Sequence, residues 1–131
     1  MSAPAYVDDI RLTLPALPEY GRLVRQCAAG LGLRRRLGFR SVDDLQLAVD
    51  ETIIALLDDT RIGGRMRLVF HVTDDEIGLD ASVHESDGRA RPLTADAQER
   101  FERFVGELVD EYDVDLVTGR ITFIKRARAA S

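Results

Sequence analysis

The stretch Ser41–Asp58, SVDDLQLAVDETIIALLD, decides the fold that this sequence predicts. Its apolar positions recur three and four residues apart, which is the period of a helix with one buried face. These positions are Leu45, Ala48, Val49, Thr52, Ile53, Leu56 and Leu57. Ser41 is a typical N-cap residue, and Asp44 three residues later approximates a capping box. We therefore predict one helix over residues 42–58, packed along this stripe.

A second face of the same predicted helix places one carboxylate among apolar neighbours. This face carries Leu47, Glu51, Ala55 and Asp58. Charged side chains are rarely surrounded by apolar ones unless they pair or serve a function. A cleft or a second partner beside Glu51 fits this pattern, and so does a solvated charge or an ion pair, which is the more common role of a lone carboxylate on a helix face.

Strands and two more helices surround the central helix in the sequence. Alternation of apolar and polar residues predicts strands at 10–14, 66–72, 77–84, 112–117 and 120–125, the second and third forming an antiparallel hairpin. One further helix is entered at Pro18 and Glu19 and continues to about Leu37. Another is capped by Thr94, and its apolar stripe includes Phe104. This order predicts an α+β two-layer sandwich, a mostly antiparallel sheet covered by helices on one face.

Length and composition indicate a single globular domain over residues 1–131, with tails at about 1–9 and 126–131. Hydrophobic residues make up 45% and charged residues 31% of the chain, which argues against disorder. The sequence has no apolar run of about 18 residues and no signal peptide, so we predict no membrane association. The single cysteine, Cys27, fits a reducing compartment, and we expect a cytoplasmic protein.

The net charge of −5 disfavours direct binding of nucleic acid, whose phosphates require a cationic surface. The two histidines, His71 and His84, have no second cysteine with which to form a zinc-binding pattern. We therefore predict no metal site.

Three short motifs carry a resemblance to a known family. They are Leu12 with Pro15, Pro18, Glu19 and Tyr20; Asp44-Leu45-x-Leu47-Ala48-Val49-x-Glu51; and Leu108-Val109-Asp110-Glu111. The chain resembles the RsbW-type anti-sigma-factor serine kinases of the histidine-kinase-like (GHKL) ATPase superfamily. The similarity covers about residues 10–125, and 44–51 is its most specific part. It implies the histidine-kinase-like (Bergerat) ATPase fold, whose order of elements agrees with the prediction made from periodicity.

The resemblance assigns a catalytic position on the central helix. In that family a glutamate acts on the attacking hydroxyl, and an asparagine four residues later holds the magnesium ion that bridges the ATP phosphates. Phosphoryl transfer depends on such positioning and charge neutralisation. The glutamate corresponds to Glu51, but the asparagine position holds Ala55, whose methyl group cannot coordinate a cation. Asp59, one turn further, is an alternative ligand, and we interpret Glu51 as an inherited, vestigial catalytic position.

The family's adenine-binding turn, Asp-x-Gly-x-Gly, corresponds here to residues 85–90, ESDGRA. Two alignments remain open. Either Glu85 occupies the aspartate position, or Asp87 and Gly88 are a remnant of the motif. Neither alignment restores both glycines, which allow backbone to approach a ligand closely. We therefore treat Glu51, Glu85, Asp87 and Gly88 as a remnant nucleotide site.

The phosphate-binding glycine run of the family is also missing. The corresponding positions hold Gln98, Glu99 and Phe101, and the acids Glu99 and Glu102 would repel phosphates at a helix N-terminus. The segment that would form an ATP lid is shortened to the residues between Glu85 and Gln98. The sequence thus predicts that ATP binding is lost or much weakened and that no cofactor is used.

Two functions follow from the resemblance. The first is an anti-sigma-factor-like binding protein in partner-switching control of transcription, a homodimer whose partner is a sigma factor, an anti-anti-sigma (STAS) protein, or both. The alternative is an active serine kinase that uses ATP and magnesium to phosphorylate its antagonist; a subunit that pairs with an intact homologue is a third option. We lean towards a protein that is not an enzyme. Its predicted partner-binding residues are Glu19, Arg22, Arg25 and Gln26, a polar helix face suited to an acidic partner, although a plain solvated face has the same pattern.

Overall fold

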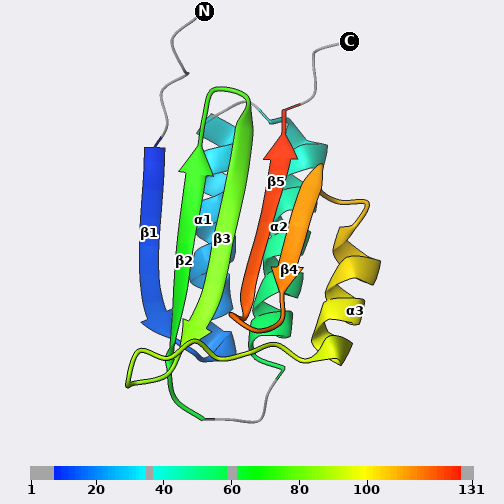
Figure 1. Cartoon of the computed structure of the whole chain (residues 1–131). Helices are drawn as coiled ribbons and strands as arrows, with labels where there is room; N and C mark the ends of the chain where they lie inside the picture. The colour runs from blue at the N-terminus through cyan, green and yellow to red at the C-terminus, as the bar shows by residue number, and fades with distance from the viewer. Residues whose placement is uncertain (1–7, 35–36, 59–61, 128–131) are drawn as a thin grey trace, which may run out of the picture.

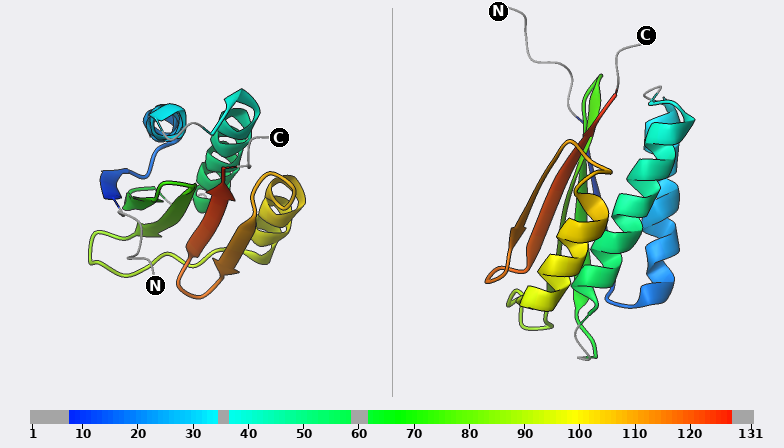
Figure 2. Two further views of the ribbon diagram at one scale, coloured as in Figure 1. Left: turned by 90° about the horizontal axis from the view of Figure 1, so that it is seen from above. Right: turned by 90° about the vertical axis from the view of Figure 1, so that its right-hand side faces the viewer.

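The computed structural model of the chain describes residues 8–34, 37–58 and 62–127. Its elements are β1 (Asp8–Pro15), the 3-10 helix η1 (Pro18–Tyr20), α1 (Gly21–Arg34), α2 (Phe39–Leu56), β2 (Arg65–Val72), β3 (Glu76–His84), α3 (Ala95–Val105), β4 (Glu111–Asp115) and β5 (Arg120–Arg126). The strands form one antiparallel sheet in the order β1-β2-β3-β5-β4. All three α-helices lie on one face of this sheet (Figure 1, Figure 2). The predicted α+β two-layer sandwich is confirmed.

The core lies between α2 and the helix-facing side of the sheet. The predicted α2 stripe is buried, except that Leu57 is only half-buried, and Thr52 satisfies its hydroxyl by donating to the carbonyl of Ala48 at 2.7 Å. Phe70 and Phe123 from the sheet and Phe101 from α3 are the largest fully buried side chains. Period-2 alternation places most of the apolar side chains of the strands on this side, and Lys125 of β5 is a charged residue that also lies there.

The predicted start of α2 is wrong. The helix begins at Phe39 rather than after Ser41, and Gly38 is its N-cap with φ 84°, a conformation that glycine adopts without strain. Ser41 is buried within the helix, so it does not cap it. Asp44 does not form a capping box either, because its carboxylate lies 3.3 Å from the Nζ of buried Lys125 on β5. The positive φ of Gly38 directs the chain into α2 at Phe39, ahead of the predicted cap.

Several boundaries also differ from the prediction. The predicted tails are shorter, because β1 already begins at Asp8 and β5 extends to Arg126, while residues 1–7 and 128–131 lie outside the described part of the chain. α1 ends at Arg34 instead of near residue 37, and α2 ends at Leu56.

The strand predicted at 112–117 occupies Glu111–Asp115. It ends early because the carboxylate of Asp115 accepts hydrogen bonds from the amides of Val117 and Thr118, which forms the turn into β5. Phe104, expected on the buried stripe of α3, is 47% exposed. The guanidinium groups of Arg100 and Arg103 lie 5.0 and 5.4 Å from its ring centre instead.

Candidate functional site

Glu51 lies on the side of α2 that faces α3. Its carboxylate is 18% exposed, and Arg100 of α3 donates from Nε to Oε2 at 3.2 Å. At the start of α3, the Thr94 hydroxyl lies 3.4 Å from a carboxylate oxygen of Asp58. α3 and its N-cap therefore contact the face of α2 that the resemblance assigned to phosphoryl transfer.

Ala55, at the position of the expected magnesium ligand, is only 3% exposed and belongs to the hydrophobic core. The alternative ligand, Asp59, lies outside the described residues. Within residues 8–34, 37–58 and 62–127, no cluster of three or more histidine, cysteine or acidic side chains has the arrangement of a metal site. The described part of α2 thus offers Glu51 without a metal ligand one turn beyond it.

Glu85, the first candidate for the adenine-binding position, pairs with Arg91 within the same loop. Arg91 is 2% exposed, and it donates from Nε to Oε1 of Glu85 at 2.7 Å and from Nη2 to Oε2 at 3.2 Å. The same Nη2 donates to the carbonyl of Gly63 at 2.9 Å. A bidentate pair of this kind fixes both partners. The carboxylate of Glu85 therefore anchors its own loop.

Asp87 and Gly88, the second candidate alignment, form a tight turn. The carboxylate of Asp87 accepts from the backbone amide of Arg89 at 3.0 Å and from its Nε at 2.7 Å. These bonds, the backbone one first, lower the pKa of Asp87 below its ordinary value. Gly88 has φ 88° and donates its amide to the carbonyl of Glu85 at 2.9 Å. In this turn Asp87 accepts hydrogen bonds from a residue two positions later and Gly88 supplies a positive φ, which are ordinary roles of aspartate and glycine in a β-turn.

The shortened lid segment is packed against the sheet. Leu93 donates its amide to the carbonyl of Leu116 at 2.9 Å. A Cβ added to Gly119 would lie 1.9 Å from the carbonyl oxygen of Arg91, and Gly119 has φ 67°. Glycine is thus required where the loop crosses the β4–β5 turn. The roles of Arg100 and Gly119 could not be predicted from the sequence, because the partner of each, Glu51 or Arg91, is far away in the chain. Arg91 has a near partner in Glu85, but its contact to the Gly63 carbonyl is equally remote.

The four residues predicted to bind partners lie together and are exposed. Glu19 belongs to η1, and Arg22, Arg25 and Gln26 to α1. Arg25 lies 3.7 Å from the carboxylate of Asp50 on α2.

A cavity of about 580 Å³ lies between this end of α1 and the C-terminal half of α2. Its lining consists of Pro18, Gly21, Arg22, Arg25, Asp50, Ile53, Ile54, Leu57 and Asp58. Ile54 is 42% exposed and lies outside the buried stripe of α2. An apolar residue away from the buried stripe is the feature of the sequence that indicates this groove. The groove combines an apolar floor with arginines along one wall.

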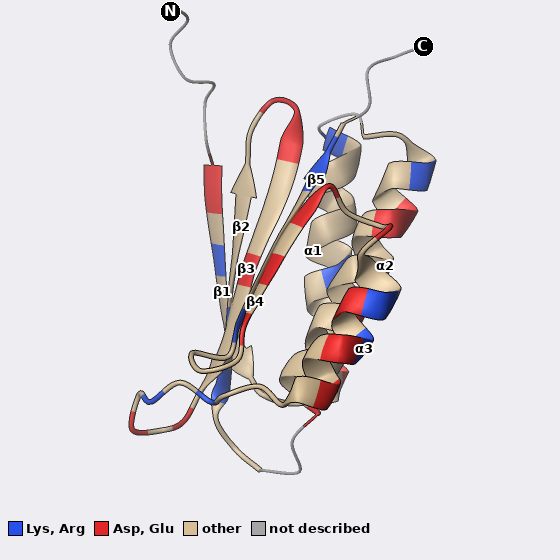
Figure 3. Cartoon of the chain, turned by 45° about the vertical axis from the view of Figure 1, so that its right-hand side comes forward, with Lys and Arg blue, Asp and Glu red and all other residues tan. Residues whose placement is uncertain are grey.

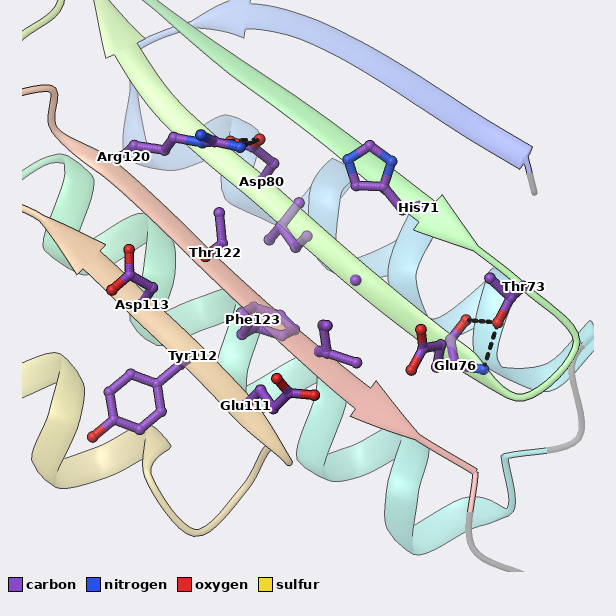
Figure 4. A pocket seen from close by; sticks show the side chains of 13 residues that line it. His71, Thr73, Glu76, Asp80, Glu111, Tyr112, Asp113, Arg120, Thr122 and Phe123 are labelled. Atoms are coloured by element: carbon purple, nitrogen blue, oxygen red, sulfur yellow. Dashed lines mark hydrogen bonds and ion pairs between the residues drawn. The ribbon is translucent and has the colours of Figure 1, made fainter. Parts of the chain in front are cut away.

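The helix-free face of the sheet carries a separate cavity of about 370 Å³ (Figure 4). Its charged side chains largely pair with one another: the Nε of Arg120 lies 3.0 Å from both carboxylate oxygens of Asp80, which raises the pKa of Arg120. His71 on this face contacts Asp9 at 2.7 Å. This cavity lies across the sheet from Glu51.

Sequence comparison identifies a relative. No family model matches the chain. The serine-protein kinase RsbW of Listeria innocua serovar 6a is 31% identical over 78 residues, which are 57% of this chain and 50% of that protein. This chain is a homologue of RsbW. The match spans about half the length of this curated relative.

The fold agrees with this relationship. The crystal structure of the RsbU and RsbW domains of Rv1364c from Mycobacterium tuberculosis matches 92% of this chain and 32% of that chain, with a TM-score of 0.62 and 15% identity. The predicted resemblance to the RsbW-type family is confirmed in sequence and in fold. No helix in the described residues is long and apolar enough to cross a membrane.

Proposed function

We propose that this RsbW homologue is a cytoplasmic, single-domain regulatory binding protein that acts in partner-switching control of transcription, with ATP binding lost or much weakened. The observation that carries this proposal is the internal pairing of Glu51 and Glu85, two of the three candidate nucleotide-binding carboxylates. Glu51 pairs with Arg100, and Glu85 pairs with buried Arg91. A nucleotide that used either carboxylate would have to displace an arginine of the chain itself.

The energetic balance favours these internal pairs. Removing one partner from a buried ion pair costs about 3–5 kcal/mol. Binding with a dissociation constant of about 1 mM releases only about 4 kcal/mol. Displacing Arg91 from Glu85 would therefore offset most of the free energy of a weak nucleotide complex. Ala55 offers no magnesium ligand in compensation, and Glu99 and Glu102 lie exposed on α3 where phosphates would need cations.

The partner-binding surface is assigned to Glu19, Arg22, Arg25 and Gln26 with the adjoining groove. Arg22 forms no ion pair with any described residue, so its guanidinium is available to a carboxylate of a partner. We propose that a sigma factor, an anti-anti-sigma (STAS) protein, or both bind here to a homodimer of this chain, without ATP or magnesium.

A second candidate function is that of an active serine kinase. Two observations favour it: Glu51 is retained on α2, and the matched Listeria relative is named a serine-protein kinase. Because Arg100 is 44% exposed, its pair with Glu51 is more easily opened than the buried Arg91 pair. This candidate requires ATP and magnesium.

Calorimetry with ATP and magnesium chloride separates the two functions. We expect a dissociation constant no tighter than about 1 mM, while sigma factors or STAS proteins from the same cell bind in the absence of nucleotide. Magnesium-dependent ATP binding at low micromolar concentration, together with transfer of the γ-phosphate to a STAS protein, would establish the kinase instead. Failure to bind any sigma factor or STAS protein would overturn the proposed function.

A further inference from the structure

The outer face of the sheet, on the side away from the three α-helices, is divided by charge. Its acidic side is the edge strand β4, where Glu111, Asp113 and Asp115 are exposed (Figure 3). Its basic side is the start of β2, where Arg65 and Arg67 are exposed and alternate with buried residues that face the helices. The two arginines therefore share one face, about 7 Å apart along the strand.

The charges of these two arginines are not neutralised within the chain. Arg65 and Arg67 form no ion pair or side-chain hydrogen bond with any described residue. The neighbouring acids are engaged elsewhere: Asp80, diagonal to Arg67 in the register with β3, accepts two hydrogen bonds from β5, and Glu85 accepts two from its own loop. Two positive charges thus remain uncompensated in a chain whose net charge is −5. A bound anion would supply the acceptors that both guanidinium groups lack.

A cavity of about 420 Å³ opens beside the two arginines. Its lining includes both of them, His84 at the end of β3, and the exposed Ser86 and Gly88 of the following turn. The ring of His84 is oriented by two contacts, from Nε2 to the hydroxyl of Ser82 at 2.9 Å and from Nδ1 to the carbonyl of Gly88 at 3.3 Å. A volume of this size is typical of sites for small organic molecules, and it exceeds what a bare ion needs.

The chemistry of the lining selects the class of ligand. Each guanidinium presents several N–H donors in a fixed fork and stays charged. A terminal phosphate carries roughly two negative charges and three acceptor oxygens, so it can accept hydrogen bonds from both forks at once. A monocarboxylate carries a single charge and two oxygens, which one fork already satisfies. A phosphate monoester therefore matches the two arginines better than a carboxylate does.

We propose that the cavity beside Arg65 and Arg67 binds the terminal phosphate of a small phosphate monoester. The two guanidinium groups hold the phosphate, and the part of the cavity towards Ser86 and Gly88 receives the organic body. The site lies across the sheet from Glu51 and from the groove between α1 and α2. It thus goes beyond the proposed function, and neither depends on the other.

A nuclear magnetic resonance titration of the isotope-labelled full chain, in low-salt buffer without phosphate, tests the site. Glycerol phosphate is the probe, and inorganic phosphate, glycerol and acetate are compared with it. We expect glycerol phosphate to shift backbone amides at the start of β2 and in residues 84–89, with a dissociation constant on the order of 1–10 mM. Inorganic phosphate should bind at least about threefold more weakly, because it lacks the organic body. Glycerol and acetate should cause no saturable shift there.

Variants that remove one charge isolate the two arginines. Arg65→Gln and Arg67→Gln each delete a charged donor, and each should weaken the binding of glycerol phosphate about tenfold. Arg11→Gln is the matched control, because it makes the same change on the outer face of β1 but outside the cavity, and it should bind like wild type. Circular dichroism of each variant checks that the fold is retained.

Several results would overturn the inference. Shifts spread over other basic surfaces, binding that Arg65→Gln and Arg67→Gln leave unchanged, or an equal loss in Arg11→Gln would remove the site. Acetate that binds as tightly as glycerol phosphate would show a general anion-binding patch, and equally tight inorganic phosphate would show a site for the free ion. Either of these two results would overturn the assignment to a monoester. Regulator binding is measured separately on α1, so its outcome leaves this test unchanged.

Discussion

The buried guanidinium of Arg91 donates to both carboxylate oxygens of Glu85, at 2.7 and 3.2 Å, and to the carbonyl of Gly63 at 2.9 Å. The side chain of Arg91 thus stabilises the loop after β3 internally and also connects this loop to the segment that precedes β2. Glu85 therefore has partners within the chain at the position that one alignment matches to the adenine-binding aspartate of the family.

Arg91→Ala should lower the free energy of unfolding by about 2–4 kcal/mol, because it removes a buried guanidinium that donates to the Glu85 carboxylate and to the Gly63 carbonyl. Urea denaturation measures this change. Arg89→Ala is the matched control, since Arg89 is 84% exposed and pairs with Asp87 in the turn, and it should cost less than about 0.5 kcal/mol. Equal effects of the two substitutions would contradict a specific role for Arg91.

Thr94→Ala should destabilise the chain by about 1 kcal/mol. The hydroxyl of Thr94 accepts a hydrogen bond from the amide of Ala97 at 3.0 Å and caps α3, as the sequence predicted. Thermal unfolding of Thr94→Ala, Thr94→Ser and the exposed control Thr118→Ala measures the effect. Only the first variant should melt at a lower temperature; a loss in Thr94→Ser would show that the cap is not what matters.

Ala55→Asn should not create ATP binding. The position is 3% exposed within the core, so an amide there is buried without a partner and should cost about 1–3 kcal/mol of stability. Calorimetry with ATP and magnesium, run beside a thermal melt, measures both outcomes. Magnesium-dependent binding by this single variant would show that the metal ligand was the only element missing.

Charge reversal on α1 should weaken the binding of a regulator. Arg22→Glu/Arg25→Glu should slow association and reduce the binding free energy by more than about 1 kcal/mol, because both arginines line the groove that we assign to an acidic partner. Surface plasmon resonance with the purified sigma factor or STAS protein reports both rates. Arg67→Glu, on the opposite face of the sheet, serves as the control and should bind normally; no change in the double variant would remove this surface from the proposal.

Cys27 should react slowly with iodoacetamide in the native state. Partial burial raises the pKa of its thiol above the ordinary value of 9.0, and only the thiolate is nucleophilic. The midpoint of the rise in alkylation rate with pH should therefore lie higher for the folded chain than for the chain in urea. Mass spectrometry of timed samples follows the reaction, and identical midpoints would contradict the effect of burial.

Elements with a local signal were predictable from the sequence. Helical period predicted the buried face of α2, alternation predicted the five strands, and the hydroxyl of Thr94 predicted the start of α3. Each depends on residues only a few positions apart, so that a single stretch contains the whole pattern. Motifs of the same kind predicted the family that the comparisons confirmed.

The pairing of the charged residues depends on the tertiary structure. Arg100 lies 49 residues from Glu51 in the chain, and Lys125 lies 81 from Asp44. No spacing in the sequence predicts such pairs, because the fold brings them together only after the helices dock on the sheet. The same holds for Gly38, whose positive φ starts α2 two residues before the predicted cap. The periodic pattern of apolar residues follows from the backbone geometry of a single helix or strand. The partner of a buried charge depends instead on which other elements pack beside it in the folded core.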